Sequence, residues 1–348
     1  SLLSSLSLSL SLSLSLSSFQ LQDIFELFVG QLGGLGLGTE HASYDLRFFL
    51  LEQLATVQSF LICVQYDFQD IVGSLFRLFF DVASAQLTHQ CYSYMLDMLT
   101  SIIMESQVLN DDLFDVIFEH ILPPRKTESP AAYVLAKNLL KATATVIEDC
   151  VFAFFHRLLG IGVSSKSDLA DRTFDLIYEL TLINGNILLK VLPQLEDQLK
   201  LEDPQRRLAV ASLLGRIFAQ PGATWHHQHR ALWAGFLGRF QDIEADVRLE
   251  CLTQARQLLV EHPDVVDDLL PRMLTALSAH EEPVRLTAIS AICDAALRVP
   301  ALLTPAVMKE LEPRRLDKKP AVRKLALTKL AELYDATATR LTAKNKNK

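Results

Sequence analysis

An arginine recurs at near-regular intervals through the second half of the chain, each time followed by apolar residues at helical spacing. The intervals between successive arginines are 35, 41, 37 and 38 residues, a period typical of two-helix solenoid repeats of the HEAT and armadillo kind. A single helical pair cannot bury its apolar face without a neighbour, so the stability of such a solenoid depends on the stacking of successive repeats. The five arginines are Arg172, Arg207, Arg248, Arg285 and Arg323.

The residues four, seven and eleven positions after each arginine predict one buried face per repeat. They are apolar in four of the five units, and in the Arg172 unit Glu179 stands between Leu176 and Ile183. The four complete stripes are Ala211/Leu214/Phe218, Leu252/Ala255/Leu259, Ile289/Ile292/Ala296 and Leu327/Leu330/Tyr334.

An acidic residue stands four positions before the arginine in four of the five units: Asp168, Asp203, Glu244 and Glu281. Such an acid suits the positive end of the helix dipole and can pair with the arginine one turn later. Pro204, Pro283 and Pro320 fall where a first-turn proline costs no hydrogen bond. The arginines could form a ligand-facing ladder or serve as caps and inter-repeat braces, and their regular recurrence favours the second interpretation.

The first half of the chain is less regular but also helical in pattern, so we expect an all-α solenoid of HEAT-like helical pairs in a right-handed superhelix, spanning 19–338. A low-complexity Ser/Leu tract, 1–18, precedes it, and a basic tail, 339–348, follows; we expect both to be disordered. The expected helices are 19–32, 42–63, 67–84, 88–106, 111–122, 130–145, 147–159, 167–184, 187–200, 204–219, 226–240, 244–261, 264–279, 282–298, 303–313 and 319–337.

The net charge of −8 argues against broad coating of nucleic acid or of an anionic membrane. Basic residues nevertheless gather near the C-terminal end, where a cluster could hold a polyanion or a protein partner. No aromatic residue interleaves these charges as a stacking platform would require, which favours a solvated face. The cluster consists of Arg314, Arg315, Lys318, Lys319, Arg323 and Lys324.

Motifs that carry enzymatic or cofactor chemistry are missing from the sequence. The triplet His226, His227 and His229 offers no helical pair four residues apart and no fourth ligand, so we expect a polar helix start and no metal site. No GxGxxG, P-loop, GxSxG or HExxH pattern occurs. The five cysteines, Cys63, Cys91, Cys150, Cys251 and Cys293, lie far apart in apolar stretches and predict buried thiols. We therefore expect a non-enzymatic protein without a cofactor or a membrane span.

Six segments, in order along the chain, resemble the sister chromatid cohesion regulators of the precocious-dissociation-of-sisters family. The resemblance implies a non-enzymatic HEAT-repeat subunit associated with cohesin in the nucleus and, indirectly, with chromatin. It also implies binding to the cohesin kleisin subunit and to release or maintenance factors such as the wings-apart-like protein and sororin. The segments are YDLRFFLLEQLATVQSFLIC (44–63), YSYMLDMLTSIIMES (92–106), SDLADRTFDLIYEL (167–180), LLKVLPQLEDQLK (188–200), LWAGFLGRFQDIEADVRLECLTQARQLLVEHPD (232–264) and LDKKPAVRKLALTKLAELY (316–334).

The chain departs from the family pattern at both ends. The Ser/Leu tract stands where the family has further N-terminal helices and an Ala/Pro-rich segment that docks peptide motifs, so no residue here inherits that docking site. The family continues through more repeats beyond residue 348, and we therefore expect an N-terminal fragment of about a quarter of a full protein. The alternatives are another HEAT scaffold, such as a transport receptor or phosphatase subunit, and a direct nucleic-acid binder that uses the basic end.

Overall fold

The computed structural model of the chain describes residues 111–160 and 172–346, together with Phe80 and six residues between 96 and 104. Every regular element in these residues is helical. The chain forms two compact units, 1–190 and 191–348. The Ser/Leu tract, the expected helices 19–32 and 42–63, most of 67–84 and 88–106, Cys63, Cys91 and Asp168 lie outside the described residues.

The first unit contains five described α-helices and one 3₁₀ turn. The predicted helices near 111, 130, 147 and 167 are present, with the last one described from residue 173. A further short helix, α7, lies between the prolines at 124 and 130, where the sequence predicted a break. The elements are α6 (Asp111–Glu119), α7 (Arg125–Glu128), α8 (Pro130–Ala142), α9 (Ala144–Leu159), α11 (Thr173–Asn184) and η2 (Gly185–Leu188).

Aromatic packing joins α6 to α9 in the core of the first unit. The Phe118 ring lies 5.2 Å from Phe154 and 6.2 Å from Phe155, measured between ring centroids. Glu179 interrupts the apolar stripe of α11, and its carboxylate accepts a hydrogen bond from the Lys126 ammonium at 2.6 Å. The polar residue in that stripe is therefore satisfied by an ion pair with the neighbouring α7.

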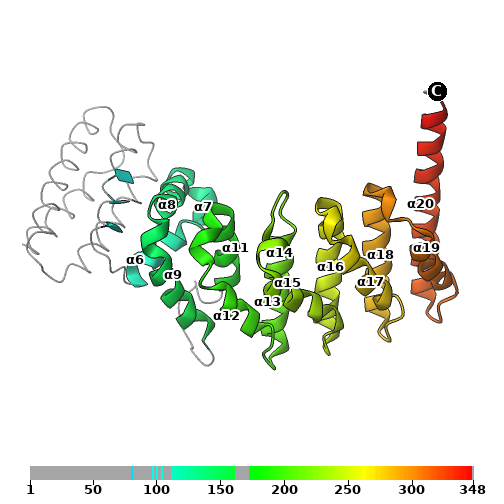
Figure 1. The fold of residues 1–348 in the computed structure, drawn as a ribbon, viewed down its shortest axis with the longest axis horizontal. Helices are drawn as coiled ribbons and strands as arrows, with labels where there is room; N and C mark the ends of the chain where they lie inside the picture. Colours follow the sequence, from blue (N-terminus) through cyan, green and yellow to red (C-terminus); the bar gives the residue numbers. More distant parts are fainter. Residues whose placement is uncertain are drawn as a thin grey trace, which may run out of the picture. The chain divides into compact units, whose positions relative to one another are not determined.

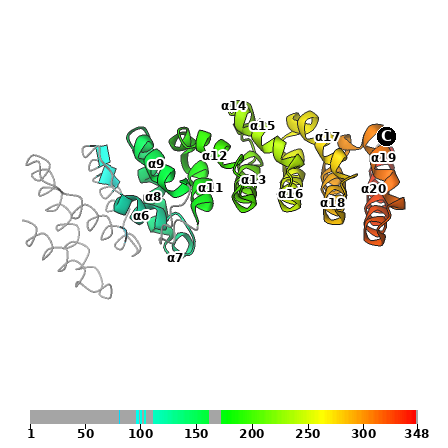
Figure 2. The same cartoon turned by 90° about the horizontal axis from the view of Figure 1, so that it is seen from below.

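The second unit is a run of helical pairs joined by short turns. Figure 2 shows α13, α16, α18 and α20 in one layer, and α14, α15, α17 and α19 in the other. The elements are α12 (Leu192–Gln198), α13 (Pro204–Phe218), α14 (Trp225–Gln228), α15 (Arg230–Gly238), η3 (Arg239–Gln241), α16 (Ala245–Glu261), η4 (Pro263–Val265), α17 (Val266–Ala276), α18 (Glu282–Arg298), η5 (Pro300–Leu302), α19 (Pro305–Leu311), η6 (Glu312–Leu316) and α20 (Pro320–Lys346).

We call the layer of α13, α16, α18 and α20 the inner layer and the other the outer layer. The inner-layer helices pack in sequence order, α13 on α16, α16 on α18 and α18 on α20 (Figure 1). This arrangement confirms the predicted all-α, HEAT-like architecture. The predicted right-handed sense of a superhelix stays a prediction.

The predicted buried stripes hold in α13, α16 and α18, where all nine side chains are at most 1% exposed. The stripe of α20 is wrong, because Leu327 is 55% and Tyr334 is 75% exposed. In the other three repeats the following helix covers this face. No described helix packs on that side of α20, so the same sequence pattern gives an exposed apolar face there.

Two glycines explain local geometry in the second unit. At Gly215 an added Cβ would lie 2.4 Å from Cγ of Gln254, so the close packing of α13 against α16 requires a residue without a side chain. Gly222 has a φ of +72° in the turn after α13, a backbone conformation that glycine adopts without strain.

Three predicted helices differ clearly from the structure, and the first is 187–200, which is divided into η2 and α12 by a turn at 189–191. The expected helix 226–240 is interrupted at His229, where the backbone leaves helical values (φ −120°, ψ 64°) and α15 begins. Helix α20 runs to Lys346, beyond the expected end at 337. The added segment contains neither glycine nor proline, so nothing in its sequence terminates the helix.

The described cysteines are Cys150, Cys251 and Cys293. Cys251 and Cys293 are buried as predicted, and Cys150 is half-buried. Burial raises the pKa of the Cys293 thiol to about 12 and raises that of Cys251 as well. No helix within the described residues combines the length and the apolar composition of a membrane span.

Candidate functional site

The repeat arginines occupy the same position in four successive inner-layer helices. Arg207, Arg248, Arg285 and Arg323 are each the fourth residue of α13, α16, α18 and α20. Arg172 differs, because it lies immediately before α11 and donates a hydrogen bond to the carbonyl oxygen of Pro123. The recurrence of the arginine in sequence is therefore a recurrence of helix position across the second unit.

Each of these four guanidinium groups closes the turn that precedes its own helix. In every case Nη1 donates to the carbonyl oxygens five and six residues earlier. For Arg207 the two distances are 2.7 and 2.8 Å, and for Arg285 both are 2.8 Å. Arg323 repeats the pattern at 3.1 and 2.7 Å, and Arg248 donates to the same pair of positions. The arginine thus satisfies carbonyl groups that no helix would otherwise engage.

Two of the arginines, Arg207 and Arg285, also contact a buried aspartate in the loop that precedes the inner-layer helix of the next repeat. Arg207 donates from Nε and Nη2 to Asp242, both at 2.9 Å, and Arg285 makes the same fork to Asp317 at 3.0 Å. All four side chains are at most 4% exposed. We call these two contacts the aspartate junctions. Paired hydrogen bonds of this kind fix both distance and orientation between neighbouring repeats.

The intervening repeat is joined differently. Arg248 Nη2 lies 3.0 Å from Oε1 of Glu281, and the glutamate side chain is 41% exposed. We call this contact the glutamate junction. Position 279, which corresponds to Asp242 and Asp317 in its distance before the next arginine, holds alanine.

The predicted pairing with the acid one turn before the arginine is wrong for Arg207 and Arg285. Asp203 caps α13 by accepting a hydrogen bond from the Gln205 backbone at 2.9 Å, and Glu281 pairs with the arginine of the preceding repeat. Arg207, Arg248 and Arg285 are therefore inter-repeat braces, as the recurrence predicted, but their partners lie one repeat further along. Asp242 and Asp317 were missed, although each stands six residues before a repeat arginine, a spacing that could have identified them.

The two buried aspartates have matching surroundings. Each accepts a hydrogen bond at 2.9 Å from the backbone N–H two residues later. Each also pairs with a second arginine, which stands three residues earlier: Arg239 for Asp242 and Arg314 for Asp317. Burial raises the pKa of Asp242, but hydrogen bonds from Arg207 and from the Glu244 backbone outweigh burial and lower it below its ordinary value. The pKa of Asp317 is lowered in the same way, against burial, by the Lys319 backbone and Arg285.

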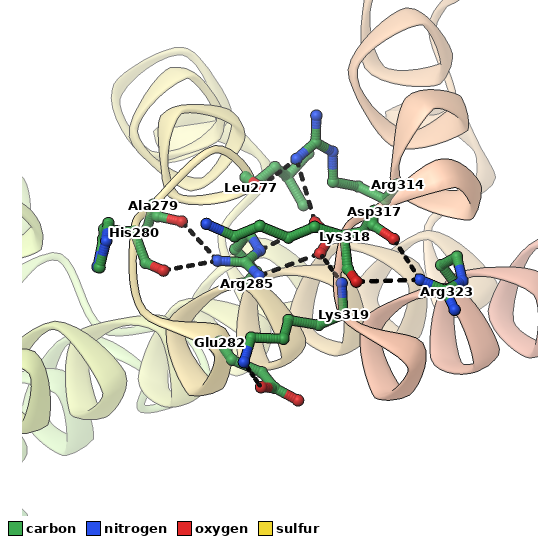
Figure 3. A network of polar contacts seen from close by, with 10 residues as sticks. All are labelled: Leu277, Ala279, His280, Glu282, Arg285, Arg314, Asp317, Lys318, Lys319 and Arg323. Carbon is green, nitrogen blue, oxygen red and sulfur yellow. Dashed lines mark hydrogen bonds and ion pairs between the residues drawn. The ribbon is translucent and has the colours of Figure 1, made fainter.

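Figure 3 shows Arg314, Lys318, Lys319 and Arg323 of the predicted basic cluster around Asp317, and the structure divides the cluster in two. Arg314 donates to the Leu277 carbonyl at 3.1 Å, Arg323 closes its own turn, and Lys319 Nζ lies 3.7 Å from Glu282. Arg314 and Arg323 therefore contribute to the network around Asp317, whereas the Lys319 side chain pairs with Glu282 beside it. The other three, Arg315, Lys318 and Lys324, are exposed. We call them the basic rim.

The histidine triplet lies at the start of the outer-layer helices α14 and α15. His226 is buried, and its Nε2 lies 2.7 Å from Oδ2 of Asp264 in η4. His227 approaches the same oxygen at 2.9 Å, while the His229 ring packs on Trp225 instead. The structure adds His262 and Asp264, two residues one repeat away that the sequence did not connect with the triplet. Within the described residues, His226, His262 and Asp264 form the one group of three side chains whose donor atoms lie close enough together to bind a metal ion.

The match to known proteins covers almost the whole chain. The family model described as "Sister chromatid cohesion protein PDS5 protein" matches residues 17–348. The chain belongs to this family. It is 40% identical over 316 residues to human sister chromatid cohesion protein PDS5 homolog A and 37% identical to human homolog B. These alignments cover 90% of this chain but only 24% and 22% of the relatives, so the chain spans about a quarter of their length.

A solved structure agrees with the PDS5 fold. The chain is similar, with a TM-score of 0.76 and 18% identity, to a structure described as that of the Pds5–Scc1 complex, covering 93% of this chain and 51% of that one. Family membership confirms the resemblance deduced from the six segments. The similarity of fold also agrees with the HEAT-like architecture that this resemblance implies.

Proposed function

We propose that this chain forms part of a cohesin-associated scaffold that regulates sister chromatid cohesion. The observation that supports this most directly is the PDS5 match across residues 17–348, with 40% identity to a human cohesion protein. A stacked array of helical pairs suits the role, because it presents an extended surface along which partner segments can bind. Under this proposal the protein binds partner segments and catalyses no reaction.

The proposed partners are the cohesin kleisin subunit and factors of the wings-apart-like and sororin types, on chromosomes in the nucleus. The kleisin assignment is supported by the similar fold of the Pds5 chain that was solved with Scc1. The two other factors follow from family resemblance alone. A transport receptor or phosphatase subunit is the alternative of the same architecture, but the family match does not favour it.

The test is recovery of partners by the full-length parent protein from nuclear extract. We expect cohesin subunits to be enriched over a tag-only control. A parallel sample that lacks residues 17–348 measures how much this segment contributes. Recovery of karyopherin cargo or of a phosphatase catalytic subunit, with cohesin at background level, would reject the proposal.

A second, weaker function is supported by the exposure of the basic rim. Arg315, Lys318 and Lys324 lie at the turn between η6 and α20, where their charges can reach a polyanion such as duplex DNA. Changing all three to Glu should weaken binding and flatten its salt dependence, by up to about 0.9 in log–log slope for each phosphate that is no longer neutralised. Arg314 is left intact in this test because it contributes to the Asp317 network.

A matched control for the basic rim changes three exposed basic residues elsewhere, Lys141, Arg230 and Lys309, to Glu. The change in net charge is the same in both variants. Electrophoretic mobility titrations at two salt concentrations should separate them. An equal decrease of binding in both variants would show that only net charge matters. Unchanged binding by the rim variant would show that the basic rim is a solvent-exposed surface without a role in polyanion binding.

A further inference from the structure

Two buried histidines and one aspartate meet where α14 faces the turn that begins η4. One donor atom from each of His226, His262 and Asp264 lies within 4.8 Å of the others. The His226 and His262 side chains are buried, and their ring centroids are 5.2 Å apart. The Asp264 side chain is 45% exposed, so the cluster has an opening to solvent. Two nitrogen donors and a carboxylate form a ligand set that zinc favours, whereas Mg²⁺ and Ca²⁺ prefer oxygen donors alone.

The hydrogen bonds around the two rings are compatible with metal ligation. His262 Nε2 lies 2.9 Å from the Gln220 carbonyl oxygen, which can only accept, so Nε2 carries the hydrogen and Nδ1 keeps the lone pair. A backbone carbonyl that holds the second ring nitrogen is the usual support for a metal-bound histidine.

Among the described residues, Asp264 is the hydrogen-bond partner of the His226 ring. Its Nε2 bonds to the Asp264 carboxylate, whereas its buried Nδ1 has no hydrogen-bond partner among the described residues. If a metal ion takes the Nε2 lone pair, the ring proton moves to Nδ1. No existing hydrogen bond of Nδ1 is broken by this shift of tautomer.

We propose that His226, His262 and Asp264 bind a divalent transition-metal ion of the zinc type. The ion would link α14 to η4, which belong to successive repeats, and leave its fourth position to water at the exposed side of Asp264. The site lies apart from the basic rim and from the aspartate junctions, so it adds a ligand-dependent brace to the outer layer. It does not depend on the cohesin partners proposed above.

The test is Co²⁺ binding to the purified full chain, followed by displacement with Zn²⁺. Co²⁺ bound with four nitrogen and oxygen ligands gives visible absorption bands, and both tryptophans of the chain lie near the cluster, with the Trp233 ring 5.8 Å from His226. We expect saturable absorption with one equivalent of Co²⁺, quenching of tryptophan fluorescence, and disappearance of both signals on addition of Zn²⁺. Zn²⁺ should also raise the melting temperature.

Two variants and one control decide the site. Asp264→Asn keeps the shape of an exposed side chain, and His262→Gln removes a ring nitrogen; each should weaken Co²⁺ binding at least ten-fold. His229→Gln removes a neighbouring histidine that packs on Trp225 outside the donor group, and it should bind as wild type. Unchanged affinity in Asp264→Asn and His262→Gln, or an equal decrease in all three variants, would overturn the proposal and leave the cluster a hydrogen-bonded contact only. Circular dichroism confirms that each variant is folded.

Discussion

The aspartate junctions and the glutamate junction solve the same problem with different chemistry. At Arg207 and Arg285 the partner carboxylate is buried and receives hydrogen bonds from two arginines and a backbone N–H. At Arg248 the partner is a half-exposed glutamate, and alanine occupies the aspartate position. The helices stack in the same way at all three places.

This difference separates two contributions: apolar burial, which stacks the helices, and paired hydrogen bonds, which fix the orientation of neighbouring repeats. Apolar burial is nearly complete in α13, α16 and α18, and it is enough to stack α16 on α18 at the glutamate junction. A buried ion pair adds little net stability when intact, since desolvation offsets the attraction, but removing one partner leaves a buried charge unpaired. The aspartate junctions therefore lock the turns in one arrangement and make those repeats sensitive to substitution.

The largest expected effect follows from removal of a buried aspartate. Asp242→Ala leaves Arg207, which is 4% exposed, without its partner, and should lower the free energy of unfolding by about 3–5 kcal/mol. Asp317→Ala should do the same to Arg285. Urea denaturation of the full chain measures both, and a midpoint within error of wild type would contradict the distinction between the junctions.

Acid should destabilise the aspartate junctions next. Asp242 and Asp317 have a lowered pKa in the folded chain, so they contribute stability above their unfolded pKa of about 3.9 that is lost as pH falls through the folded value. We expect the urea midpoint of the wild type to fall steeply below about pH 4. Asp242→Asn, which has no carboxylate to protonate, should show a shallower fall; equal slopes would argue against a pKa linked to the fold.

Rebuilding an aspartate at the glutamate junction should give a smaller, opposite effect. Ala279→Asp places a carboxylate where Asp242 and Asp317 stand, opposite Arg248, whose side chain is 15% exposed. We expect a gain of about 0.5–1 kcal/mol, because a charge-assisted hydrogen bond is partly offset by desolvation. The gain should vanish in an Arg248→Met background, and a gain that survives there would show that the new carboxylate acts elsewhere.

The smallest expected effect belongs to the existing glutamate. Glu281→Gln should leave the urea midpoint unchanged, because an exposed ion pair is screened by solvent. The matched comparison is Asp242→Asn, the same change of carboxylate to amide at a buried site. If Glu281→Gln destabilised the chain as much as Asp242→Asn, exposure would not be what distinguishes the two kinds of junction.

The solenoid itself could be read from the chain because its signal is local and repeated. An arginine followed by apolar residues at helical spacing identifies the inner-layer helices, and Pro204 and Pro320 mark the first residues of α13 and α20. The resemblance to the family is carried by short segments such as FLGRFQDI. These features depend on residues within one helix, and the sequence displays them directly.

The partners of those residues were decided only by the tertiary structure. Arg207 meets Asp242 35 residues later, and His226 meets Asp264 38 residues later, because stacking places each turn beside the corresponding turn of the next repeat. Asp203 is closer to Arg207 in sequence, but it caps α13 by accepting a hydrogen bond from the Gln205 backbone. Leu327 and Tyr334 repeat a buried pattern and are exposed, since burial depends on whether a neighbouring helix covers the face. Sequence period thus determines which face a helix presents, while contacts between repeats determine what that face meets.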